Sequence, residues 1–173
     1  DPTSSYAQAQ AFAIGRSMDD VIITAATGDA KTGETGGTTT SLPSTQKVLV
    51  TDRATGSGST GLNIEKLRKA KFILDNNSVD PSIPRVIVVG PKQIQDLLAF
   101  TEVTSSDFST VKALAQGQLD SFLGFQFIVS TRLALDSSSD VRTCFAYAVD
   151  GLTLAVAKDL TVRIDERPDK GYA

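Results

Sequence analysis

Histidine and tryptophan are absent from this chain of 173 residues, and cysteine occurs once, at position 144. Without histidine, neither a Ser-His-Asp nor a Cys-His catalytic arrangement can be built. The common zinc sites, which use histidine and several cysteines, are excluded as well. Cys144 has no partner for an internal disulfide and lies in an alternating run, which indicates a buried strand thiol rather than a nucleophile. We therefore expect no enzyme activity, no cofactor and no metal site.

The chain also lacks a membrane-spanning apolar run, a signal peptide and an excess of basic residues. Its net charge is −3 and its pI is about 4.9, so it has no electrostatic footprint for coating nucleic acid. The basic residues of 66–71 are spread around a helix and indicate a solvated face. With 40% hydrophobic and 21% charged residues, the composition is that of an ordinary soluble globular protein.

The longest regular pattern covers residues 3–26 and predicts a helix of about six turns. Gly28 is suited to the left-handed turn that ends helices. The apolar residues recur at steps of three and four. We expect the larger ones to be buried against strands of the C-terminal half, and these are Ile14, Met18, Val21 and Ile22.

Residues 28–61 are rich in Gly, Thr and Ser, which predicts an exposed excursion with one short strand at 48–50. The glycine density of residues 28–37 resembles that of a phosphate loop, but the Gly-Lys-Ser/Thr ending is missing and the stretch follows a helix. A second candidate anion site is the helix N-terminus after the sequence VIVVGP. Pro91 removes one of its donors, so this signal is weak.

The middle of the chain alternates helices and strands. Asn63 is the expected cap of a helix over 63–76. Residues 85–90, RVIVVG, form a continuous apolar and β-branched run, which predicts a central strand covered on both faces. Pro91 begins the next helix, for which the inward residues are Ile94, Leu97 and Leu98.

Further strands are expected towards the C-terminus. Residues 122–130 place Phe125, Phe127 and Val129 on one face, with a bend at Gly124. Strands over 142–149 and 152–157 are expected to form a hairpin at the Asp150-Gly151 pair. Another strand is expected over 161–165. Mixed helices and strands with late hairpins predict an α+β fold.

The order of these pieces resembles the major capsid proteins of tailed bacteriophages, which have the Hong Kong 97-like capsid fold. The features that carry this resemblance are the long helix entering ITAATGDAKTGETG, the strand RVIVVGP before QIQDLLAF, the stretch TVKALAQGQLDSFLGFQFIVSTRL, and the final AYAVDGLTLAVAKDLTVRIDERPDKGYA. The last two are the most specific. Family members also have an N-terminal arm and an extended loop before the long helix, and a further strand after the last match. The resemblance therefore implies a central fragment.

The resemblance implies three parts. Residues 1–61 would hold the spine helix and the Gly/Thr-rich loop of the peripheral domain. Residues 62–141 would form the axial domain around the capsomer axis, and 142–173 would return to the peripheral domain. Candidate residues at the subunit interface are Thr104, Ser105, Ser106, Ser109, Thr110 and Gln118.

The function implied by the resemblance is structural. Copies would self-assemble into hexamers and pentamers of an icosahedral shell that encloses DNA without sequence specificity. Scaffold and portal proteins are possible partners, no membrane is involved, and the protein would be in the virion, or in the host cytoplasm during assembly. The alternatives are an encapsulin-like compartment shell, another phage structural protein, and an α/β nucleotide-binding enzyme; the last is disfavoured by the missing histidine and phosphate-loop lysine.

Overall fold

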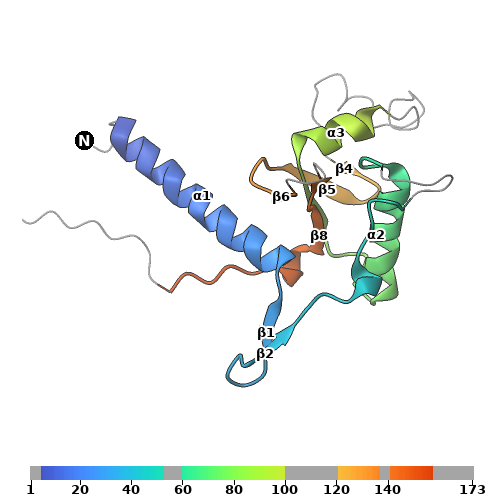
Figure 1. The fold of residues 1–173 in the computed structure, drawn as a ribbon, viewed down its shortest axis with the longest axis horizontal. Coiled ribbons are helices and arrows are strands. Elements are labelled where there is room, and N and C mark those ends of the chain that lie inside the picture. The colour runs from blue at the N-terminus through green and yellow to red at the C-terminus, as the bar shows by residue number, and fades with distance from the viewer. Residues whose placement is uncertain (1–4, 53–59, 100–120, 137–140, 158–173) are drawn as a thin grey trace, which may run out of the picture.

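The computed structural model describes residues 5–52, 60–99, 121–136 and 141–157 (Figure 1). This part of the chain is a mixed α/β structure, the class that the sequence predicts. In chain order its elements are α1 (Ser5–Thr27), β1 (Ala30–Thr32), β2 (Thr38–Thr40), the 3-10 helix η1 (Ser44–Gln46), α2 (Ile64–Asn76), β3 (Arg85–Val89), α3 (Pro91–Leu98), β4 (Ser121–Phe122), β5 (Phe125–Val129), β6 (Leu135–Asp136), β7 (Val141–Arg142), β8 (Phe145–Ala148) and the 3-10 helix η2 (Val149–Gly151).

The main sheet has the strand order β4-β5-β3-β8, and every residue of β3 is buried. On one side β3 pairs in parallel with β5, from Arg85 opposite Phe125 to Val89 opposite Val129. On the other side it pairs antiparallel with β8. The prediction that RVIVV forms a central strand is confirmed, because its unbroken apolar pattern matches burial on both faces.

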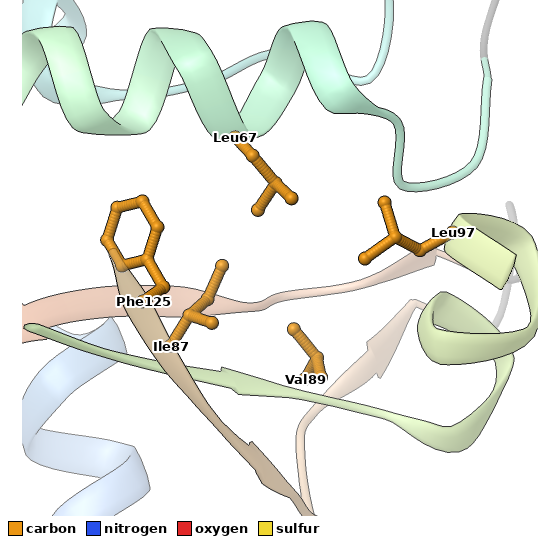
Figure 2. Close-up of a cluster of buried hydrophobic side chains, with 5 residues drawn as sticks. All are labelled: Leu67, Ile87, Val89, Leu97 and Phe125. Carbon is orange, nitrogen blue, oxygen red and sulfur yellow. The ribbon is translucent and has the colours of Figure 1, made fainter. Parts of the chain in front are cut away.

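The core lies between this sheet and the helices α2 and α3. Figure 2 shows its five buried side chains, which are Leu67, Ile87, Val89, Leu97 and Phe125. The Asn63 side chain caps α2 by accepting a hydrogen bond from the Lys66 N–H at 2.8 Å, as the sequence predicts. Pro91 occupies the first turn of α3, where its missing N–H costs nothing.

A tight turn connects β4 to β5. Leu123 and Gly124 have φ values of 52° and 82°, and two consecutive positive values are typical of a two-residue type I′ hairpin. Gly124 thus makes the predicted bend. The predicted inward face is only partly correct: Phe125 is fully buried, but Val129 is 55% exposed at the far end of β5, beyond the residues that β4 pairs with.

The predicted buried face of α1 is wrong for two of its four residues, since Ile14 and Ile22 are half-buried and the other two are exposed. Val21 is 56% exposed and Met18 is exposed, whereas Ile23 is the buried residue, at 8% exposure. Only the C-terminal end of α1 meets the body of the protein, and the rest of the helix projects away from it (Figure 1). The apolar spacing therefore predicted the helix correctly, but the described residues leave most of that helix uncovered.

Two further predictions fail near the ends of strands. Residues 48–50 form no strand, and residues 152–157 do not pair with β8. The Val149 N–H donates to the Pro84 carbonyl at 3.0 Å, and Asp150 and Gly151 then continue as the 3-10 helix η2. The chain therefore leaves the sheet instead of reversing in a hairpin. The predicted strand over 161–165 lies outside the described residues.

Candidate assembly surface

Helix α1 is fixed to the body by its last two turns. Ile23 packs with Val88 of β3 and Leu133, on the sheet face opposite to α2 and α3. Beside this contact Asp20 accepts hydrogen bonds from Arg132, through Nε at 2.5 Å and also through Nη2. This hydrogen bond is the main reason that the pKa of Asp20 is lowered from its ordinary value.

The loop that receives α1 is itself held in place. Arg142 donates through Nη1 to the carbonyls of Thr131 and Leu133, at 2.9 and 3.0 Å. The Thr143 N–H donates to the Ala134 carbonyl at 3.1 Å. The attachment point of α1 is therefore an ordered loop, and the angle of the helix to the body is defined by a charged contact and an apolar contact together.

The remainder of α1 is an open helical surface. The helix has 23 residues and is about 35 Å long. Phe12 is 67% exposed, and Met18 and Val21 are also exposed. In proteins most of the stability of a helix comes from packing of an apolar face against another surface. An uncovered helix carrying these side chains is suited to contact with another protein surface.

The polar groups around the start of α2, on the other side of the sheet, stabilise the structure and do not form a reactive centre. Lys66 is buried and its Nζ donates to the carbonyls of Thr60 and Gly61, at 2.5 and 2.9 Å. Desolvation is the main cause of the lowered pKa of Lys66. The nearby Lys69 pairs with Asp52 at 2.8 Å. These contacts tie the end of the long excursion to α2.

The geometry supports neither an anion site after VIVVGP nor a reactive cysteine, although Cys144 lies between β7 and β8 and not in the strand that the sequence predicts. At the N-terminus of α3, a Cβ on Gly90 would lie 2.6 Å from Gln93 Oε1 and 2.8 Å from Arg142 Cδ, so the protein's own side chains fill this position. Cys144 is half-buried, and burial raises the pKa of its thiol, which makes it a poor nucleophile. The described residues contain no group of three or more possible metal ligands.

The interface residues predicted from the sequence, 104–118, lie outside the described residues, so they stay a prediction. The open face of α1 was missed, because apolar residues at helical spacing are usually buried within the same chain. A signal was present in the sequence: residues 5–15 of the helix carry no charge and are dominated by small and amide side chains. Within the part of the chain that the structure describes, no helix is long and apolar enough to span a membrane.

The fold and this surface define a structural α/β subunit with an exposed helix for contact with other proteins. The family model for phage capsid proteins matches the whole chain, residues 1–173. The chain therefore belongs to the phage capsid protein family. Membership implies a structural rather than an enzymatic role, self-association into a shell, and a place in the virion. No curated protein and no solved structure matches the chain.

Proposed function

We propose that this protein is the major capsid subunit of a tailed phage or prophage, with the Hong Kong 97-like fold. Copies assemble into hexamers and pentamers of an icosahedral shell that encloses DNA without reading its sequence. The observation that carries the proposal is the family match along the full chain. The open face of α1 supports it, because a subunit that works alone has no reason to expose a 23-residue helix with Phe12 and Val21 uncovered.

In this proposal α1 is the spine of a peripheral domain that comprises 1–61 and 142–173, and residues 62–141 form the axial domain. The strand β8 connects the two, because it pairs with β3 in the sheet of the axial part. The residues around 104–118 lie near the capsomer axis, where one patch meets a different patch on the next copy. Scaffold and portal proteins are further partners. The net charge of −3 suits a shell that holds DNA by enclosure, since tight binding would need a basic surface.

Electron microscopy of the complete protein tests the proposal. The protein is expressed alone and together with the products of neighbouring phage structural genes. We expect closed particles built of pentamers and hexamers in at least one of the two samples. A monomer in both samples would contradict a capsid subunit. Particles that package a protein cargo in place of DNA during infection would support the encapsulin-like alternative.

The ring contact has its own test in the same protein. Ser106→Arg and Thr110→Arg add a long charged side chain at the proposed capsomer axis. We expect both variants to keep the melting temperature of the subunit and to lose particle formation. Normal particles from both variants would remove this segment from the interface.

A further inference from the structure

The hairpin of β1 and β2 projects from the body between α1 and α2 (Figure 1). Its strands pair with Lys31 opposite Thr39, and all six of their residues are exposed. A two-stranded hairpin without a buried face is marginally stable in water. Pairing with a further strand would therefore stabilise it.

On the side of β2 that faces away from β1, the open edge, one residue presents its backbone N–H and C=O. The Thr32 hydroxyl on β1 donates to the Thr38 carbonyl at 3.4 Å, so this carbonyl points towards β1. Peptide groups alternate in direction along a strand. The N–H and C=O of Thr39 therefore point away from β1, and none of the turn, loop and cap hydrogen bonds of the described residues involves this backbone.

The edge of β2 carries none of the features that usually prevent strand addition. Natural edges are protected by lysine, proline or a bulge. The strand Thr38–Thr40 is three threonines, which are β-branched, uncharged and well suited to a sheet. Lys31 is on the other strand, and its ammonium group is held by the Thr39 hydroxyl at 2.6 Å.

We propose that the β2 edge pairs antiparallel with the β2 edge of a second copy of this chain, which makes a four-stranded sheet across two subunits. The choice of a second copy rests on the proposed function. It also follows from the strand itself: pairing centred on Thr39 places Thr38 opposite the partner subunit's Thr40, so every residue of the paired edge is an uncharged threonine. The Lys31 ammonium group, held by the Thr39 hydroxyl, lies beside the pair and not within it. Thr–Thr pairs across strands are favourable. The contact is two-fold and self-complementary.

Cysteine crosslinking tests this pairing with a matched control. In the proposed sheet the two copies of Thr39 have Cα atoms about 5.5 Å apart, within the range for a disulfide. The two copies of Lys31 are three strand spacings apart, about 14 Å, which is too far. Lys31 lies directly opposite Thr39 on the hairpin and is equally exposed. Both Thr39→Cys and Lys31→Cys also remove the same Lys31–Thr39 hydrogen bond.

We expect Thr39→Cys to give at least about tenfold more disulfide-linked dimer than Lys31→Cys under mild oxidation of the complete protein, because a paired edge holds the thiols at high effective concentration. Equal crosslinking of the two variants, crosslinking of Lys31→Cys alone, or no crosslinking of either would overturn the proposal. Thr39→Glu provides a second measurement, since it opposes two like charges across the pair. It should weaken association about tenfold in sedimentation, and unchanged association would also contradict the pairing.

The two proposals can fail separately. Shells that form normally while Thr39→Cys gives no dimer would retain the capsid function and remove the β2 contact. A protein that forms no shell but crosslinks selectively at Thr39 would retain the β2 contact and remove the capsid function.

Discussion

Asp20 on α1 and Arg132 in the loop after β5 are 112 residues apart in the sequence and form a two-pronged ion pair. This pair, together with the packing of Ile23, fixes a projecting helix to the body of the protein. The angle at which α1 leaves the body decides where its open face can meet another copy.

The first prediction concerns this ion pair. Asp20→Asn removes the negative charge and should increase amide hydrogen exchange in the last two turns of α1. Asp19→Asn is the matched control, because it removes an adjacent charge that also acts on Arg132 but makes none of the hydrogen bonds to it, so the comparison isolates those hydrogen bonds. Equal protection in the two variants would show that the pair does not hold the helix.

The same pair predicts a pH dependence. The pKa of Asp20 is lower in the folded protein than its ordinary value of 3.8. The stabilisation is therefore fully present well above 3.8 and is lost as the pH falls through the lowered pKa. We expect the protection factors of the amides in the last turns of α1, which correct for the intrinsic pH dependence of exchange, to fall in acid. They should fall less in Asp20→Asn, in which the carboxylate is already absent.

The apolar contact of α1 gives the next prediction. Ile23→Asp places an unpaired charge among Val88 and Leu133 and should lower the free energy of unfolding by about 3 kcal/mol. Val21→Asp introduces the same group two residues away, at a side chain that is 56% exposed, and should change stability by less than about 0.5 kcal/mol. Urea denaturation measures both. A larger loss for Val21→Asp would mean that the predicted face of the helix is the packed one after all.

The outcome for α1 shows what the sequence could and could not decide. Apolar spacing located the helix, but spacing is the same whether a face packs within the chain or against a neighbour. The burial of the central strand could be predicted more directly than that of α1. The run at 85–89 is apolar or β-branched at each position after Arg85, and only burial on both faces explains that pattern. The hairpin predicted at Asp150-Gly151 is absent because the Val149 N–H bonds instead to the Pro84 carbonyl. This contact joins residues 65 positions apart, so a local turn sequence cannot predict it.

The candidate surface was harder to predict than the fold. The exposure of Phe12 and the Asp20–Arg132 pair depend on the direction in which α1 leaves the body, and this direction is set by distant loop residues. The sequence showed that the threonines of β2 belong to a Thr-rich stretch. It could not show that one edge of β2 stays unpaired, because this depends on which strand β2 pairs with. Sequence patterns report local periodicity, whereas these surfaces are defined by what the rest of the chain leaves uncovered.

Lys66 gives a prediction about the connection into α2. Lys66→Ala leaves the carbonyls of Thr60 and Gly61 without their donor and should cost about 2 kcal/mol. Arg68 is on the same helix and exposed, and among the described residues its ion pair is with Glu65. Arg68→Ala should therefore cost less than about 0.5 kcal/mol. Chemical denaturation compares the two, and equal losses would contradict a specific structural role for the Lys66 ammonium group.

The last prediction tests the open face of α1 in assembly. Phe12→Asp places a charge at the most exposed large apolar side chain of the helix. Since this side chain is 67% exposed in the single subunit, the melting temperature should change little. Burial of Phe12 against another copy would instead make the charge costly, so the yield of particles should fall at least about tenfold.

Gln10→Asp is the matched control, because it adds the same charge two residues earlier, on the opposite side of the helix and also at an exposed position. Particle yield is measured by sedimentation and electron microscopy of the complete protein. Loss of particles in Phe12→Asp with normal particles in Gln10→Asp would place the apolar side of α1 in a subunit contact. Normal particles in both variants would mean that this face stays open in the shell. A lower melting temperature in Phe12→Asp alone would mean that Phe12 packs within its own subunit.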